Sequence, residues 1–540
     1  MGLTFEVFLA ATLLIYLSFT HFHFKSYDLA LIKEKKSVKL HLAEILSTED
    51  LNDVFITNLK LSSDQRTLTK SILTDTNYLS DFVNTSNFEI VHPHSFVSPN
   101  SIQDFTNISN INQAPNFPLN EITSEYNFWR IYPEQIHLSW TENEFEMRVT
   151  WVTYIYLAGR LVYRSLICDD GNGATNWTEI ETSTISFDEG NNMIRIQYIH
   201  TGVMKNIKDN CIYEYMVGNS WFWSDFYSFH GITPSYSRNN SFKKGGARLI
   251  IIGDWGIGII GTFTNALLKE DIENRQIDGI IHLGDLAYDL QEDEGKNGDK
   301  FLNMIQPIAA KVPYMTIPGN HESSKNFTHY STRFNMPINN ANEGKGWFYS
   351  YNLGKAHFIM MNLEQYYLSW LGECIEPHIN WLIEDLKEAQ LNRDIRPWII
   401  FMSHRPFYCS TNSSNCFRDV KKIKLIEEIL YENKIDLVLQ AHVHNYERDS
   451  PVYNNTNLSG PNDTEHYYYS PKAPIYIVNG NAGNYEAHND QFTKLKEEWF
   501  IYGTVDYGYS RLIVFNETHL HFEMYSSEKN QEVDYFWIIK

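Results

Sequence analysis

Apolar and polar residues alternate along much of the stretch from residue 132 to residue 230, as in "IHLSWTENEFEMRVTWVTY" and "NMIRIQYIHTGV". Successive side chains of a β-strand point to opposite faces, so this alternation predicts strands with one buried face. The strands are rich in Val, Ile, Tyr and Trp, and Gly, Asn and Asp lie between them. About a hundred residues with this pattern predict a small β-sandwich, which we place at residues 129–236.

A different pattern begins after Arg248, where short apolar runs alternate with segments of helical period such as "TFTNALLKEDIENRQ". The runs are "RLIIIGDWG", "IDGIIHLGDLAY", "VPYMTIPGNHE", "HFIMMNLE", "RPWIIFMSHRP", "KIDLVLQAHVH" and "APIYIVNGNAG". Strands that alternate with helices are typical of a layered α/β domain with a largely parallel core. We assign this domain to residues 247–540.

The first residues carry an apolar run from Val7 to about Phe19, which is too short to span a bilayer comfortably. Its length suits a secretory signal, so we expect a signal peptide at residues 1–20. A signal anchor and a buried core helix are the alternatives. Residues 21–128 are rich in Asn, Ser and Thr with weak periodicity, which indicates a poorly ordered extension or pro-region.

The formal net charge is −22, and the carboxylates are dispersed without a basic patch. This charge argues against nucleic-acid binding, which depends on neutralising phosphates. No later stretch is long and apolar enough to span a membrane, so we expect no membrane association after signal cleavage. The expected location is extracellular or the endolysosomal lumen.

Acceptor sites for N-glycosylation support the secretory interpretation. Ten Asn-x-Ser/Thr sites occur, at Asn84, Asn107, Asn176, Asn239, Asn326, Asn412, Asn454, Asn457, Asn462 and Asn516. Of the five cysteines, we expect local disulfides between Cys168 and Cys211 and between Cys409 and Cys416, which leaves Cys374 unpaired. Free buried thiols are the alternative.

Several of the apolar runs end in residues that can bind a metal ion. Asp254, Asp285 with Tyr288, Asn320 with His321, His404, and His442 with His444 follow successive predicted strands. In an open α/β sheet, ligands gather beyond the carboxyl ends of the strands, so these side chains are expected to converge. Each alone would more often be a turn, a cap or packing, but five such strand ends in order favour a metal site.

The ligand types define the kind of site. This set of candidate ligands exceeds the four of a zinc ion and suits two metal ions that share a bridging carboxylate. Oxygen and nitrogen donors without thiolate fit iron, zinc or manganese, and a phenolate favours Fe(III).

The motifs "GDWG", "GDLAY", "GNHE", "FMSH" and "AHVH", in this order, resemble those of the metallophosphoesterases, and specifically of the purple acid phosphatases. "NGDKF", "GWFYSYNLGKAHFI" and "WIIFMSHRPFYCS" extend the likeness, which covers roughly residues 130 to 537 and is greatest to the animal iron/zinc purple acid phosphatase-like proteins. The resemblance implies a layered β-sheet sandwich flanked by helices, preceded by an all-β domain of the fibronectin type III kind. It also implies a secreted acid phosphatase that hydrolyses small phosphomonoesters with a metal-activated hydroxide.

The family's residue roles can be transferred to the matching positions. By this resemblance, Asp254, Tyr288 and His444 would hold Fe(III), and Asp285 would bridge both ions. Asn320, His404 and His442 would hold a divalent zinc, iron or manganese ion. His321 would lie near the leaving-group oxygen, and Asn320 and His321 would contact the substrate.

Two departures from the family limit the transfer. Highly active plant members carry further histidines after the fourth motif, whereas this chain reads "HRPFYCSTNSSNCF". Arg405 could contact phosphate instead, or form a structural salt bridge, which we favour slightly. Ala441 replaces the more common Gly, which would be costly only at positive φ. A phosphodiesterase or nucleotide hydrolase on the same scaffold, and a glycoprotein with a binding role, remain alternative functions.

Overall fold

The computed structural model describes residues 131–168, 173–188, 195–208, 211–231, 246–275, 277–338, 346–368, 375–411, 421–486 and 497–540. The predicted signal peptide (1–20) and the Asn/Ser-rich extension (21–128) lie outside these residues. So do four of the predicted glycosylation sites and two of the cysteines, namely Asn84, Asn107, Asn239, Asn412, Cys374 and Cys416.

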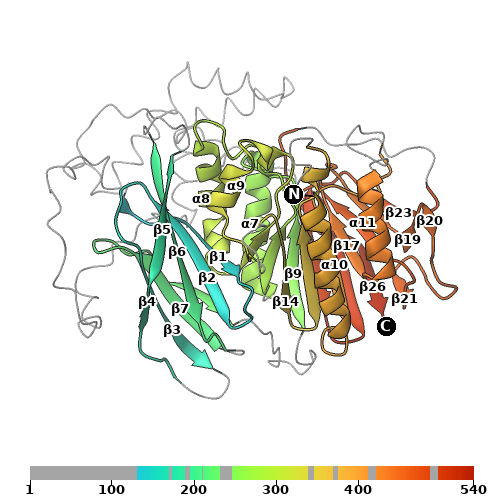
Figure 1. Cartoon of the computed structure of the whole chain (residues 1–540), viewed down its shortest axis with the longest axis horizontal. Helices are drawn as coiled ribbons and strands as arrows, with labels where there is room; N and C mark the ends of the chain where they lie inside the picture. The colour runs from blue at the N-terminus through green and yellow to red at the C-terminus, as the bar shows by residue number, and fades with distance from the viewer. Residues whose placement is uncertain are drawn as a thin grey trace, which may run out of the picture. The chain divides into compact units, whose positions relative to one another are not determined.

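The alternating segments form the predicted β-sandwich, built from two sheets of four strands (Figure 1). The first sheet has the order β1 (Glu134–Trp140), β2 (Glu146–Thr153), β6 (Ile196–Lys205), β5 (Thr182–Asp188). The second has the order β4 (Thr178–Ile180), β3 (Arg160–Cys168), β7 (Cys211–Gly218), β8 (Tyr227–His230). Inward-facing residues such as Val149, Trp151 and Leu161 are fully buried, which accounts for the alternation in the sequence.

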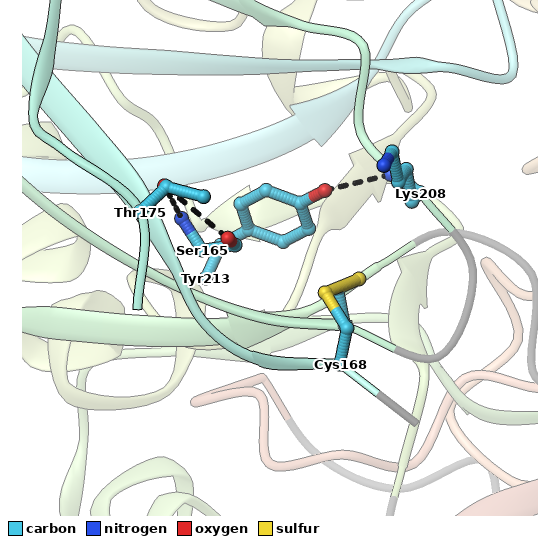
Figure 2. Close-up of a disulfide and its surroundings, with 6 residues drawn as sticks. Ser165, Cys168, Thr175, Lys208 and Tyr213 are labelled. Atoms are coloured by element: carbon cyan, nitrogen blue, oxygen red, sulfur yellow. Dashed lines mark hydrogen bonds between the residues drawn. A yellow bond between two sulfur atoms is a disulfide. The ribbon is translucent and has the colours of Figure 1, made fainter. Parts of the chain in front are cut away.

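A disulfide joins the two central strands of the second sheet, which confirms the predicted pair Cys168–Cys211 (Figure 2). The two cysteines lie directly opposite each other in the antiparallel pairing of β3 with β7, and their Cα atoms are 4.1 Å apart. Beside them, the backbone N–H of Lys208 donates to the phenol oxygen of Tyr213 at 2.8 Å. Cys409 is also a disulfide cysteine, but its predicted partner lies outside the described residues.

The α/β domain contains two seven-stranded sheets, and each of the seven predicted apolar runs forms a strand in one of them. One has the order β13 (Tyr314–Thr316), β11 (Gly279–His282), β9 (Ala247–Ile252), β24 (Gly508–Val514), β25 (His519–Ser526), β26 (Gln531–Ile539), β21 (Tyr467–Tyr469). The other has the order β14 (Phe348–Leu353), β15 (Ala356–Met361), β16 (Trp398–Met402), β17 (Leu437–Gln440), β22 (Ile475–Asn479), β18 (Tyr446–Asp449), β23 (Phe500–Thr504). Two short pairs complete the strands: β10 (Trp255–Gly256) with β12 (Leu286–Ala287), and β19 (Val452–Tyr453) with β20 (Thr456–Asn457).

Helices follow many of these strands. The described α-helices are α7 (Ile259–Arg275), α8 (Lys296–Ala309), α9 (Thr328–Arg333), α10 (Ile375–Leu391) and α11 (Lys421–Glu432), with 3-10 turns η5 (His321–Ser323) and η6 (Glu364–Tyr366). Helices α10 and α11 lie together against the second sheet, where Leu382 and Ile426 share a buried cluster with Phe401 (Figure 1). No helix in the described ranges is long and apolar enough to cross a bilayer.

The prediction of a largely parallel core is only partly right. The strands that precede the candidate ligands have parallel neighbours. In one sheet β11 pairs parallel with both β9 and β13. In the other sheet β15, β16, β17 and β22 pair parallel in this order. The last three strands, β24 to β26, instead form antiparallel hairpins, and β24 pairs antiparallel with β9. Short turns join these strands, and a short turn can connect only antiparallel neighbours.

The β-sandwich is fixed to the α/β domain at the buried carboxylate of Asp299 in α8. This carboxylate accepts hydrogen bonds from Gln197 Nε2 at 2.7 Å and from Tyr154 Oη at 2.9 Å, both in the sandwich. Arg333 of α9 donates to it at 2.8 Å, and Arg195 of the sandwich forms an ion pair with it. Because its partners come from both domains, this buried carboxylate holds α8 against the sandwich.

Candidate metal centre

The candidate ligands lie in the loops that follow five parallel strands. Asp254 follows β9, Asp285 follows β11, Asn320 lies between β13 and η5, His404 follows β16, and His442 and His444 follow β17. The carboxyl ends of parallel strands meet at one edge of a sheet, which is why residues distant in sequence converge here. The structure divides them into two groups.

The first group contains Asp254, Tyr288 and His444. The phenol oxygen of Tyr288 lies 2.9 Å from His444 Nε2 and 3.2 Å from Asp254 Oδ1. His444 Nε2 lies 3.3 Å from the same Oδ1 atom, so three donor atoms form a compact triangle. All three residues are almost fully buried, and burial together with Asp254 raises the pKa of Tyr288 well above its usual value.

The second group contains Asp285, His404, Asn320 and His442. His404 Nε2 lies 3.2 Å from Asp285 Oδ2 and 3.2 Å from Asn320 Oδ1. Ligand atoms of Asp285, His404 and His442 all lie within 4.8 Å of one another, close enough to share a metal ion. His442 Nδ1 is buried and has no hydrogen-bond partner among the described residues, which leaves a buried polar atom of this group unsatisfied.

Opposing effects act on the imidazole of His404. Burial disfavours its charged form, but the carboxylates of Asp285, Asp254 and Glu364 together outweigh burial and raise the pKa of His404 to about 10. The other ring nitrogen, Nδ1, lies 2.7 Å from the carbonyl oxygen of Leu283, a contact that fixes the ring with Nε2 toward Asp285. A carbonyl contact at the second nitrogen is the usual way in which a protein orients a metal-binding histidine.

His321 lies between carboxylates at the edge of both groups. Its Nδ1 is 3.1 Å from Asp289 Oδ1, and its Nε2 is 3.6 Å from Glu486 Oε1 and 4.0 Å from Asp285 Oδ2. Burial lowers the pKa of His321, but Asp285, Glu322 and Asp289 together raise it above its usual value. At mildly acidic pH the ring is therefore an imidazolium with a proton available at Nε2.

Strained backbone is concentrated at the candidate ligands. Asp254, Asp285, Tyr288 and His442 have positive φ values of 59°, 55°, 54° and 69°. Each left-handed non-glycine residue costs roughly 1–2 kcal/mol, so the surrounding contacts must impose these conformations. Strain of this kind is commonly found where side chains are held for binding or catalysis.

The backbone at position 441 accommodates alanine. Ala441 is not among the described residues with positive φ; its neighbour His442 is. The methyl group of Ala441 instead packs close to Gly253, where an added Cβ would lie 2.5 Å from it. Ala is therefore tolerated at position 441, and the adjacent requirement for glycine falls on Gly253.

Glu322 connects two of the ligand loops. Its Oε2 accepts hydrogen bonds from the backbone N–H groups of Asp285 at 2.9 Å and Gly319 at 2.7 Å. Its Oε1 accepts one from Leu286 at 2.9 Å. Three buried hydrogen bonds thus fix the loop of Asp285 to the loop of Asn320.

Arg405 forms the structural salt bridge that was the favoured alternative. Its Nε lies 2.8 and 2.9 Å from the two carboxylate oxygens of Glu364, and both side chains are largely buried. Its Nη1 also lies 2.8 Å from His442 Nε2, on the side of the ring opposite the unpartnered Nδ1. Arg405 therefore orients His442 and balances the charge of Glu364.

Three residues that sequence reasoning did not select complete the surroundings. Glu486 lies 3.9 Å from His444 Nε2 and near His321, and the exposed ring of Tyr485 packs on Tyr288 with centroids 5.0 Å apart. Asp289 contacts His321 directly. Glu486 follows β22, whose run "APIYIVNGNAG" ends at the same edge as the other ligand strands. Its place after this run is the sequence feature that could have identified it.

Six of the predicted glycosylation sites lie in the described residues. Asn176, Asn326, Asn454 and Asn462 are exposed, whereas Asn457 and Asn516 are half-buried. Asn457 Nδ2 donates to the carbonyl of Glu498 at 2.9 Å, so its amide is already engaged. Attachment of glycans at any of these sites stays a prediction.

Comparison with known protein families matches three consecutive parts of the chain. Residues 133–231 match "Purple acid Phosphatase, N-terminal domain", residues 247–446 match "Calcineurin-like phosphoesterase", and residues 473–535 match "Iron/zinc purple acid phosphatase-like protein C". The order of these matches follows the order of the domains in the structure.

Individual proteins show the same similarity. Acid phosphatase type 7 of Danio rerio is 36% identical over 434 residues, and that of Homo sapiens is 32% identical over 423 residues. Each alignment covers 76% of this chain and 91% of the relative. A purple acid phosphatase from yellow lupin (Lupinus luteus) seeds has a similar fold, with a TM-score of 0.61, 24% identity, and coverage of 76% of this chain and 74% of that one.

Proposed function

Because the chain belongs to the purple acid phosphatase family and is a metal-dependent phosphatase, we propose that it hydrolyses phosphomonoesters at a binuclear centre. The single observation that carries the proposal is the division of the candidate ligands into two groups. One group centres on Tyr288 and the other on Asp285. In each group the donor atoms lie close enough together to bind one metal ion.

The donor types fit the two ions that we assign. Asp254, Tyr288 and His444 would hold Fe(III), because a phenolate is a hard anionic donor. Asn320, His404 and His442 would hold zinc, iron or manganese as the divalent ion, with Asp285 shared between the two. The unpartnered Nδ1 of His442 supports this assignment, since a ligand would satisfy it. When bound, the two ions would neutralise phosphate charge and lower the pKa of a bound water.

The chain's own residues supply the proton and the orientation. His321, kept protonated by its carboxylate neighbours, would hold a proton at Nε2 for the departing alcohol oxygen. Asp289, bound to Nδ1, fixes the ring so that Nε2 faces the site. Asn320 and His321 would contact the phosphate, since both lie in η5 or at its start, next to Asp285.

We also propose that the protein is secreted or lies in the endolysosomal lumen. The N-terminal apolar run and the Asn-x-Ser/Thr sites support this location. The disulfide between Cys168 and Cys211 supports it further, because such bonds persist in oxidising compartments.

A substrate panel tests the proposed reaction. Purified, metal-analysed protein would be assayed with phosphomonoesters and phosphodiesters from about pH 4 to about pH 8. We expect hydrolysis of monoesters with an acidic optimum. Preferential hydrolysis of diesters would support the alternative enzyme on the same site. Metal-loaded protein that cleaves neither class would overturn the proposal in favour of a binding glycoprotein.

A further inference from the structure

The side chain of Asn297 holds the loop that carries Tyr288. Its Nδ2 lies 3.1 Å from each of three carbonyl oxygens, those of Ala287, Tyr288 and Asp289. These are consecutive residues, and one amide group has two hydrogens to share among them. The three contacts link one polar side chain to the whole turn.

That turn is strained throughout. Ala287, Tyr288 and Asp289 have φ values of 66°, 54° and 77°, all in the left-handed region that non-glycine residues avoid. Consecutive left-handed residues direct their carbonyls to one side, where they repel each other unless a donor lies between them. Asn297 provides that donor, so its amide stabilises a conformation that the turn would not adopt alone.

The turn positions two groups of the site. Tyr288 directs its phenol oxygen to Asp254 and His444, and Asp289 contacts His321 Nδ1 at 3.1 Å. A rotation of the turn would displace the phenol and the carboxylate together. Asn297 touches neither the donor atoms nor His321, so its influence on them is indirect.

Backbone hydrogen bonds fix the position of Asn297. It lies in the first turn of α8, and its backbone N–H donates to Glu292 at 3.2 Å, while that of Gly298 donates to Leu290 at 3.2 Å. Two residues further on, Asp299 binds Arg333 and the β-sandwich. The helix start is therefore anchored on both sides, and the sandwich is linked to the Tyr288 turn through Asn297.

We propose that Asn297 is a positioning residue of the phosphatase centre, which sets the place of Tyr288 and, through Asp289, that of His321. The proposal rests on the proposed function in taking Tyr288 as a metal ligand and His321 as the proton donor. The link from the β-sandwich through Asp299 and Asn297 also assigns that domain a part in the geometry of the site.

The test compares Asn297→Ala and Asn297→Asp with the control Asn265→Ala in full-length protein. Asn265 Nδ2 donates to a single carbonyl, that of Met304, at 2.9 Å and takes no part in the site. The first readout is hydrogen exchange of residues 286–290 in metal-free protein. We expect exchange in this turn to rise about tenfold in Asn297→Ala, the order expected from lost buried hydrogen bonds, and to stay unchanged in the control.

The second readout uses the iron-loaded protein. The tyrosinate charge-transfer band should shift or weaken in Asn297→Ala, and kcat should fall more than KM rises. Asn297→Asp keeps the shape but puts a carboxylate against three carbonyls, so it should be at least as damaging as Ala. If Asn297 served only for packing, Asp at this position would be tolerated.

The possible outcomes distinguish a failure of the positioning role from a failure of the proposed function. Unchanged exchange in the turn, or an Asn297→Asp variant with wild-type exchange and spectrum, would overturn the positioning role. A wild-type protein that binds no iron or cleaves no phosphomonoester would contradict the proposed function, while the exchange of the metal-free turn would still report on Asn297.

Discussion

His444 Nε2 lies 2.9 Å from the phenol oxygen of Tyr288, although 156 residues separate them in the chain. Tyr288 follows β11 and the short strand β12, whereas His444 follows β17 of the other seven-stranded sheet. Only the packing of both sheets produces the contact, and the group that the two residues form with Asp254 has the donors expected around Fe(III).

Tyr288→Phe tests this group by spectroscopy. A phenolate bound to Fe(III) absorbs visible light by charge transfer, so the iron-loaded wild type should be coloured and the variant should not. The phenol is buried with its neighbours, so the substitution removes one oxygen without changing the packing of the ring. An iron-loaded wild type without a visible band, or a band that persists in Tyr288→Phe, would refute the assignment.

His321→Ala should retain both metal ions and lower kcat by about a hundredfold or more, the usual effect of losing a general acid. Activity needs the protonated ring, so it should decline as pH rises through the pKa of His321, which its carboxylate neighbours raise. Asp289→Asn removes one of these carboxylates, so the alkaline limb of the pH profile should move to lower pH. A limb at the same pH in Asp289→Asn would remove Asp289 from this role.

Glu322→Gln should lower stability rather than abolish folding. The carboxylate accepts three backbone hydrogen bonds, and an amide would direct an NH2 group against at least one of the N–H donors. We expect a loss of about 1–3 kcal/mol in the free energy of unfolding, together with weaker metal retention. Chemical denaturation of metal-free wild type and variant measures it, and equal midpoints would contradict the connecting role of Glu322.

Buried histidines outside the site should make the fold less stable in acid. Burial lowers the pKa of His137 to about 4 and that of His378 to about 3, from 6.5. Above about pH 6.5 both are neutral in either state and contribute nothing to the pH dependence. As pH falls from there toward 4, the unfolded chain takes up protons that the folded chain excludes. The free energy of unfolding should therefore fall by up to about 1.4 kcal/mol per pH unit for each histidine.

Denaturation at several pH values measures this slope. His137→Gln and His378→Gln each remove one such proton, so each slope between about pH 4 and about pH 6.5 should decrease by about 1 kcal/mol per unit. Slopes identical to wild type in both variants would show that these histidines titrate alike in the folded and unfolded chain.

The pattern of apolar residues predicted much of the fold. Alternation identified sandwich strands such as β6, in which buried and half-buried residues largely alternate. Continuous runs such as "RLIII" identified buried strands but do not encode their direction, since both faces are covered either way. The antiparallel placement of β24 beside β9 therefore could not be predicted, because it depends on long-range pairing.

The candidate site was predictable where chemistry and position coincide. Asp254, Asp285 and His404 stand directly after apolar runs, so the topology of parallel strands alone places them at one edge. Asn297 could not be predicted in the same way, because an Asn in a polar loop usually indicates turn chemistry. Its role depends on the left-handed backbone at Tyr288, which side-chain pattern does not reveal.

The central claim is that two metal ions share Asp285, and metal analysis of the purified protein tests it most directly. We predict two ions per chain in the wild type, and loss of both ions together with phosphatase activity in Asp285→Ala. An Asp285→Ala variant that keeps its metal and turns over phosphomonoesters would contradict the claim.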